Sequence, residues 1–280
     1  MNKNKKTKKI IQHSIMIVFT AIMIYPLVWM LSSSLKESSS VFVDAHSLIP
    51  KGLHFENYIT GWQGFGGITF STFFLNSAII AVVATVGSII SSTIIAYGFA
   101  RIKFAGKKVW FICMMLTMML PFEMVMIPQY IMFNEFGWID TYYPLILPTF
   151  FGIPFFIFLI MQFIRTIPIE LDEAARIDGC NSFGIFFRII VPLIVPAMMT
   201  SAIFSFYWRW DDFMGPLIYL STPEKYPVSL ALKLFSDPNS VTNWGAMFAM
   251  STLSIVPIFV IFFFFQRYIV DGISTSGLKG

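Results

Sequence analysis

The chain has 280 residues, of which 56% are hydrophobic and only 12% are charged. Soluble domains usually carry about 25% charged residues, so this deficit excludes an ordinary water-soluble fold. The net charge of +4 is small and concentrated at the N-terminus, which argues against a nucleic-acid-binding protein. The two cysteines, Cys113 and Cys180, form neither a metal-ligand spacing nor a disulfide framework. Lipid is the solvent that fits this composition, and we expect no metal and no cofactor.

Six apolar runs follow one another along the chain, and a membrane-spanning helix needs about twenty such residues. The runs lie near residues 10–31, 74–97, 109–127, 145–164, 189–207 and 246–265. The first run follows five lysines, as in a signal peptide, but it is longer than a usual signal core and no small-residue cleavage site follows closely. We therefore expect a retained first span and an all-α membrane protein with six transmembrane helices.

Lysine and arginine are distributed unevenly between the loops. The N-terminal segment, residues 101–108, residues 165–188 and the C-terminal tail together hold fourteen of the nineteen. The positive-inside rule then predicts that both termini are cytoplasmic, in agreement with an even number of spans. We expect three parts: residues 1–71 (basic segment, first span and outer segment), residues 72–270 (transmembrane domain) and residues 271–280 (cytoplasmic tail).

The cytoplasmic loop after the fourth apolar run has the pattern of a short helix lying outside the membrane. Pro168 suits a first-turn position, and the acidic residues after it complement the positive end of a helix dipole. Gly179 suits the left-handed position just past a helix end. Asn181 or Ser182 can then cap the next helix, which leads into the fifth span.

Three residues of this short helix go beyond a well-formed surface helix. Ala174 and Ala175 bare one side, so that another protein can approach closely. Asp178 lies in the last turn, where its charge opposes the helix dipole, and we expect it on the same side as the alanines. A local rule broken without compensation indicates a functional site. Alternatively, Asp178 forms an Asx turn with Gly179 and the residues after it.

The same loop resembles the EAA loop of binding-protein-dependent ABC importer permeases. The matching positions are Glu173, Ala174, Ala175, Asp178, Gly179, Ile189 and Pro192. Cys180 stands where that family usually has alanine, and Val191 where it usually has leucine. In the family this loop is a coupling helix seated in a groove of the ATP-binding subunit. The resemblance therefore implies that Glu173, Ala174, Ala175, Asp178 and Gly179 form the docking face.

Two further stretches, residues 210–219 and 266–280, resemble the carbohydrate branch of these permeases, specifically the smaller permease of maltose-type importers. The first departs from the usual pattern, because Asp211 stands where asparagine is expected. By composition alone, the second is a polar stop-transfer tail. The resemblance implies a multi-pass subunit in a prokaryotic plasma membrane that moves a sugar or oligosaccharide by alternating access. The implied partners are ATPase subunits, a second homologous permease and an extracytoplasmic sugar-binding protein.

Candidate residues for the cargo path are fewer and have alternative interpretations. Asn76 belongs to a group of uncharged polar side chains in the second apolar run, which suit either a polyol or helix packing. Glu123 is the only carboxylate in the third run, and intramembrane carboxylates are functional candidates unless they lie near the interface. Trp210 and Asp211 lie at the outer end of the fifth run, where tryptophan is also typical of the interfacial belt.

Other functions make different predictions. Residues 106–108 lack the earlier glycine and the hydroxyl residue of a Walker A loop, so the chain is not expected to be an ATPase itself. A secondary transporter would need charges deep in several spans, and these are scarce. A scaffold or sensor would leave the docking loop unexplained. A permease for peptides or amino acids remains an alternative, because the loop is shared among importers.

Overall fold

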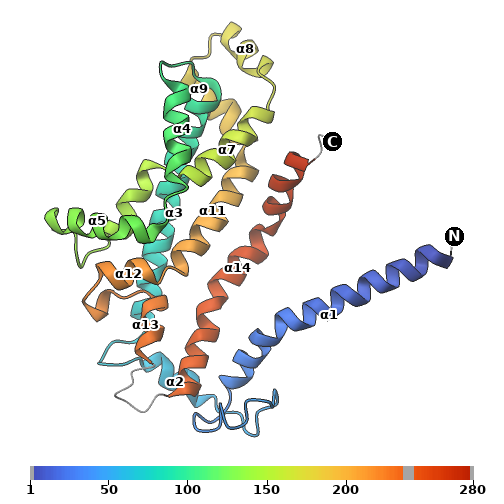
Figure 1. Ribbon diagram of the computed structural model, residues 1–280, viewed down its shortest axis with the longest axis vertical. Helices are drawn as coiled ribbons and strands as arrows, with labels where there is room; N and C mark the ends of the chain where they lie inside the picture. The colour runs from blue at the N-terminus through green and yellow to red at the C-terminus, as the bar shows by residue number, and fades with distance from the viewer. Residues whose placement is uncertain (1–2, 236–242, 278–280) are drawn as a thin grey trace. The chain divides into compact units, whose positions relative to one another are not determined.

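The computed structural model describes the backbone of residues 3–235 and 243–277 and the side chains of residues 7–233, 235 and 243–268 (Figure 1). In these residues the secondary structure is helical, and the only extended pairing is an isolated bridge between Phe65 and Ile68. The prediction of an all-α fold is confirmed.

The longer helices are α1 (Lys3–Ser33), α2 (Glu56–Gln63), α3 (Phe70–Arg101), α4 (Lys107–Thr117), α5 (Phe122–Glu135), α7 (Pro154–Thr166), α8 (Glu170–Ile177), α11 (Val195–Trp210) and α14 (Trp244–Gly277). The shorter ones are α6 (Tyr143–Ile146), η1 (Leu147–Phe151), α9 (Ser182–Ile185), the π-helix η2 (Phe186–Ile190), α10 (Val191–Leu193), α12 (Met214–Tyr219), η3 (Pro223–Lys225) and α13 (Val228–Leu234).

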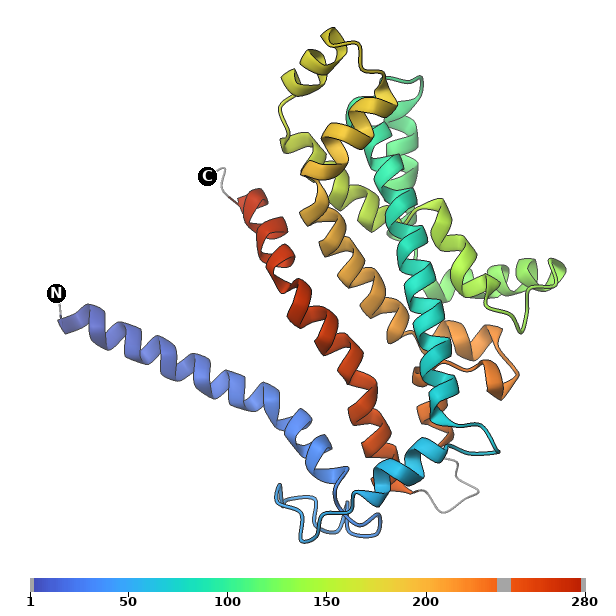
Figure 2. The same ribbon diagram turned by 180° about the vertical axis from the view of Figure 1, so that it is seen from behind.

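The chain divides into two compact units. Unit 1 comprises Met1–Ser71 and Ala231–Val256, and unit 2 comprises Thr72–Leu230 and Pro257–Gly280. Within unit 2, α7 contacts both α4 and α11 (Figures 1 and 2). The functional division predicted from the sequence, at residues 71 and 270, stays a prediction.

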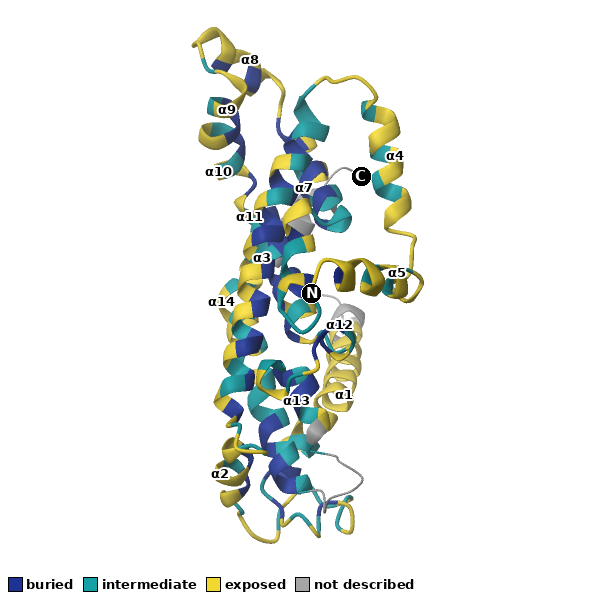
Figure 3. Cartoon of the chain, turned by 90° about the vertical axis from the view of Figure 1, so that its left-hand side faces the viewer, coloured by how far each residue is buried: buried dark blue, intermediate teal, exposed yellow. Residues whose placement is uncertain are grey.

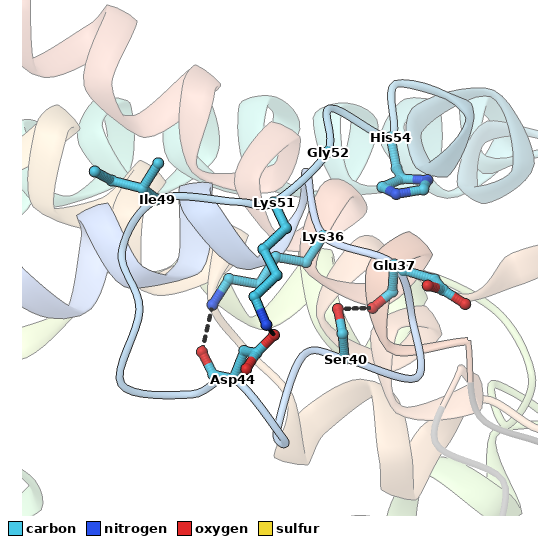
Figure 4. A pocket seen from close by; sticks show the side chains of 8 residues that line it. All are labelled: Lys36, Glu37, Ser40, Asp44, Ile49, Lys51, Gly52 and His54. Carbon is cyan, nitrogen blue, oxygen red and sulfur yellow. Dashed lines mark hydrogen bonds and ion pairs between the residues drawn. The ribbon is translucent and has the colours of Figure 1, made fainter.

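Unit 1 carries the segment between α1 and α2, which Lys36 organises from within. Its buried ammonium group donates hydrogen bonds to the carbonyl oxygens of Asp44, at 3.0 Å, and Ser47, at 2.7 Å. Lys51 forms an ion pair with the Asp44 carboxylate at 2.7 Å, and Lys36 and Lys51 line a small hollow of about 100 Å³ (Figure 4). A segment without regular structure thus satisfies its backbone carbonyls through a lysine.

Four helical stretches of the described chain are long and apolar enough to cross a membrane. They are Thr7–Ser33, Phe70–Arg101, Tyr143–Thr166 and Trp244–Tyr268. Two bent helix pairs bring the number to six if each pair is one span. The predicted third and fifth spans are these bent pairs.

Proline explains both bends. In the third span, α4 and α5 meet at 100°, and Pro121 stands between them in an extended conformation. A proline lacks the backbone N–H that would continue the helix and disfavours helical geometry in the residue before it. In the fifth span, the segment Ser182–Leu193 meets α11 at 73° beside Pro192 and Pro196. Hydropathy measures only the composition of a run, and it therefore does not predict the angle between the two helices that the run forms.

One core cluster of unit 2 joins α3, α7, α8 and the start of the fifth span. Its fully buried members include Ile160 and Ile164 of α7 and Ile185 and Ile190 after α8. The end of unit 2 that holds α8 also carries the lysines and arginines of residues 101–108, which the sequence predicts to be cytoplasmic. Because Ala175 of α8 belongs to this core cluster, the short helix α8 packs against the spans.

Candidate functional site

The predicted short helix outside the spans is confirmed as α8. It ends in a Schellman motif: the N–H of Cys180 donates to Ala175 O at 2.9 Å, and that of Gly179 to Arg176 O at 3.0 Å. Gly179 has φ +83°, the left-handed conformation expected for it. Asn181 caps α9 by accepting a hydrogen bond from the Gly184 N–H at 2.8 Å. The end of α8 and the start of α9 are thus fixed by local backbone chemistry.

α8 has one face toward the protein and one toward the surroundings (Figure 3). Asp172 and Ala175 face inward, with exposed fractions of 0% and 7%. The exposed residues of α8 and of the turn after it are Glu170, Leu171, Glu173, Ala174, Arg176, Ile177, Asp178 and Gly179.

The expectation that Ala174 and Ala175 share the open side is wrong for Ala175. Consecutive residues of an α-helix point about 100° apart, and Ala175 packs into the core cluster of α3 and α7. Ile177, which the sequence did not single out, is 87% exposed and takes a place on the outward face.

Asp178 does not form the alternative Asx turn. The donor for such a turn is the N–H of Cys180, and that group is already bonded to Ala175 O. In the described part of the chain the Asp178 carboxylate accepts no hydrogen bond and forms no ion pair. Among the described residues its charge, which opposes the helix dipole at the C-terminus of α8, is therefore uncompensated.

The inward face of α8 is tied to the end of α3. Asp172 Oδ2 lies 3.4 Å from Arg101 Nε, and Arg101 Nη2 donates a 2.6 Å hydrogen bond to Ile167 O. One turn earlier on α3, the Tyr97 hydroxyl donates to Ser182 O at 3.2 Å. Both side chains of the ion pair are almost completely buried.

Two of the residues predicted for the cargo path have packing roles. The Asn76 amide donates to the carbonyl oxygens of Glu224 and Tyr226, at 2.8 and 3.0 Å. Trp210 is buried and stacks on Phe206, with ring centroids 5.5 Å apart. Both contacts agree with the packing interpretation of these residues.

The other two predicted cargo residues are exposed. Glu123 lies in the first turn of α5, and Asp211 directly follows α11. Partial burial raises the pKa of Asp211, and the neighbouring carboxylate of Asp212 raises it further. Among the described residues, no group of histidine, cysteine or acidic side chains is placed to hold a metal ion.

Sequence reasoning missed a cavity of about 310 Å³ between α5, α6, α11 and α12. Its polar lining includes Arg209 and Asp212, which form an ion pair at 3.6 Å, and Gln129, whose Oε1 accepts a hydrogen bond from the Tyr219 hydroxyl at 3.3 Å. The i, i+3 spacing of arginine and aspartate at the end of an apolar run was the available signal.

A second missed feature ties two loops of unit 2 together at Asp140, which has the unusual φ of +58°. Its carboxylate accepts hydrogen bonds from the backbone N–H groups of Ser221 and Thr222, both at 3.0 Å, and from the Thr222 hydroxyl. The Lys225 ammonium group binds it at 2.8 Å. These donors, Lys225 first, hold the pKa of Asp140 well below its usual range.

A helical membrane fold with an exposed helix between its spans, which ends in a Schellman motif, indicates a transport permease. The family described as "Binding-protein-dependent transport system inner membrane component" matches residues 88–275, and the chain belongs to this family. It is thus a multi-pass permease component of the bacterial inner membrane, without an ATPase domain of its own, and its partners are an ATPase and a binding protein. The predicted family and membrane location are confirmed.

Individual relatives agree along nearly the whole chain. The chain is 37% identical over 257 residues to the Probable ABC transporter permease protein YurM of Bacillus subtilis (strain 168), covering 91% of this chain and 84% of that protein. It is 34% identical to the Arabinooligosaccharides transport system permease protein AraQ of the same organism, covering 92% and 91%. A solved bacterial ABC transporter involved in the import of the acidic polysaccharide alginate shares its fold, with a TM-score of 0.83, 22% identity and coverage of 96% and 98%.

Proposed function

We propose that this chain is the smaller of two homologous permease subunits in an importer that moves an oligosaccharide into the cell by alternating access. The outward face of α8 carries this proposal, because it offers a carboxylate without a partner among the described residues and an exposed isoleucine on a helix that ends in a Schellman motif. The name of AraQ, which concerns arabinooligosaccharides, supports a carbohydrate cargo. So do residues 210–219 and 266–280, although the side chains from residue 269 onward lie outside the described residues.

The docking face on α8 comprises Glu173, Ala174, Ile177, Asp178 and Gly179. Ile177 is the apolar anchor that a groove of the ATPase would bury, and the two carboxylates lie around it. A central apolar anchor with a charged rim is the usual arrangement of a specific interface. Ala175 is left out of the docking face, because it is buried in this chain's own core.

The cargo path passes the cavity between α5, α6, α11 and α12. Arg209, Asp212 and Gln129 offer hydrogen-bond donors and acceptors beside aromatic rings, which suits a polyol. Glu123 and Asp211 each adjoin in sequence a residue that lines the cavity, and they stay candidates for its mouth. Asn76 and Trp210 do not line this cavity and have the packing roles described above.

The test is transport by the complete importer, reconstituted in vesicles with its binding protein and a labelled arabinooligosaccharide. We expect uptake only with ATP, and the double substitution Glu173→Lys, Asp178→Lys should abolish both uptake and stimulated ATP hydrolysis. Glu135→Lys is the matched control, since it reverses an exposed carboxylate at the far end of α5. Uptake without ATP would favour a secondary transporter. A peptide retained by the co-purified binding protein would overturn the carbohydrate assignment.

A further inference from the structure

The buried ion pair between Arg101 and Asp172 is an unusual use of two charges. Asp172 belongs to the acidic first turn of α8, where Glu170 and Glu173 already complement the helix dipole from the exposed side. Asp172 instead points inward and is completely buried. Burying a charge pair costs about as much desolvation energy as its attraction returns, so stability alone does not explain it.

The geometry of this pair makes Arg101 a junction between three segments. Arg101 is the last residue of α3, and its guanidinium group reaches both Ile167 O, just after α7, and Asp172 on α8. A guanidinium group presents several donors in a rigid plane and can hold two acceptors at once, which a lysine does less well. Neither Asp172 oxygen has a hydrogen bond in the described chain, so the carboxylate depends on Arg101 alone for its charge partner.

The position of α3 in the chain gives this junction its significance. α8 is joined covalently to α7 and α9, and any movement of α8 reaches those helices through the backbone. α3 has no such link, and it meets this loop through Arg101, the Tyr97 hydroxyl bond and core packing.

At its other end, α3 holds the loop that follows α12. Asn76 donates to the carbonyl oxygens of Glu224 and Tyr226, and the Ser77 hydroxyl accepts a 2.8 Å hydrogen bond from the Val228 N–H. From Asn76 to Arg101, α3 is one unbroken helix, about 38 Å long at 1.5 Å per residue (Figure 2). A single rigid element thus connects the docking helix to the loop at residues 224–228.

We propose that the Arg101–Asp172 pair is a positioning contact that makes α3 move with α8, so that the push of the ATPase reaches the loop at residues 224–228. This inference rests on the proposed docking of the ATPase on α8. The pair is buried between α3 and α8. Its part is to join two elements that the backbone leaves separate.

The test measures assembly and coupling separately in the complete importer. Asp172→Asn and Arg101→Gln each leave one buried charge unpaired, so both should lower the yield of assembled complex. The double variant Arg101→Gln, Asp172→Asn removes both charges and should recover that yield. Coupling, measured as cargo molecules imported per ATP hydrolysed in assembled complexes, should stay about tenfold or more below wild type in all three variants. Glu170→Gln, an exposed acid of the same helical turn, should leave both quantities unchanged.

Recovery of wild-type coupling in the double variant would overturn the proposal and leave the pair a purely structural role. Failure of the proposed function is distinguishable, because Ile177→Asp would then leave the ATPase bound and active whatever Arg101 does.

A second measurement works even if the double variant does not assemble. In an importer that keeps the Arg101–Asp172 pair and has Cys113 and Cys180 replaced by serine, spin labels at Leu171→Cys and Ile94→Cys should keep the same separation with and without ATP. Both positions are exposed, one on α8 and one on α3. A change of one helical turn, about 5 Å, would contradict joint movement of the two helices.

Discussion

Two ion pairs in unit 2 differ in nearly every physical respect. The Lys225–Asp140 pair is short at 2.8 Å and partly exposed, and its carboxylate also accepts bonds from Ser221 and Thr222. The Arg101–Asp172 pair is longer at 3.4 Å, almost completely buried, and its carboxylate has no hydrogen bond in the described chain.

The difference separates a contact that holds two loops in place from a contact that makes two helices move together. A fully satisfied carboxylate has one preferred arrangement, and Asp140 therefore locks two loops together. A buried charge with a single partner must follow that partner, because separation would leave both charges unpaired in a medium of low dielectric. We infer that the Asp140 site is static and that the Asp172 site transmits movement.

The largest effect on stability is expected from Asp172→Ala. It leaves the Arg101 guanidinium buried without its counter-ion, and removing one partner of a buried pair costs about 3–5 kcal/mol. Thermal unfolding of the purified importer in detergent would measure the loss. A loss no larger than that of Asp140→Asn would contradict the contrast between the two pairs.

The next effect concerns binding. Ile177→Asp places a charge at the centre of the proposed docking face, and a central anchor contributes about 2 kcal/mol, or roughly thirtyfold in affinity. Because Ile177 is exposed in this chain, the substitution should leave unfolding unchanged. Titration of the ATPase onto the purified permease pair would measure the affinity. Thermal unfolding of the same pair would measure the stability. Ile49→Asp, at an exposed isoleucine of unit 1, is the control.

Asp140→Asn should cost on the order of 1–2 kcal/mol, since it weakens charge-assisted hydrogen bonds at a partly exposed site. The pKa of Asp140 is lower in the folded protein than in the unfolded chain. Its stabilisation is therefore fully present above the unfolded value of about 3.9 and is lost as the pH falls through the folded value. The difference between the unfolding temperatures of wild type and variant should thus begin to shrink below about pH 4 and keep shrinking as the pH falls further. A constant difference down to pH 2 would show that the ion pair is not responsible.

An effect of similar size is expected from Gly179→Ala. The φ of +83° at this position suits glycine, and another L-residue pays roughly 1–2 kcal/mol there. The strain falls on the turn that ends α8, so ATP-dependent transport should decrease more than overall stability. Gly137→Ala, at another positive φ in the same unit, is the control for strain unrelated to docking.

The sequence predicted the features that local chemistry determines. Gly179 and Asn181 fix the ends of their helices by backbone geometry and capping, and both were predicted correctly. The inward turn of Ala175 was not predictable, because an eight-residue helix does not reveal which side meets its own core. The Arg101–Asp172 and Asp140–Lys225 pairs join residues far apart in the chain, and no local pattern signals such contacts.

The docking of the ATPase on α8 can be tested directly by photo-crosslinking in the assembled importer. A benzophenone amino acid at Ile177 should crosslink to the ATPase subunit. The same probe at Ile59, an exposed position on α2, should not. Absence of the product at Ile177, with an equal or stronger ATPase crosslink from Ile59, would contradict the assignment of α8 as the docking helix.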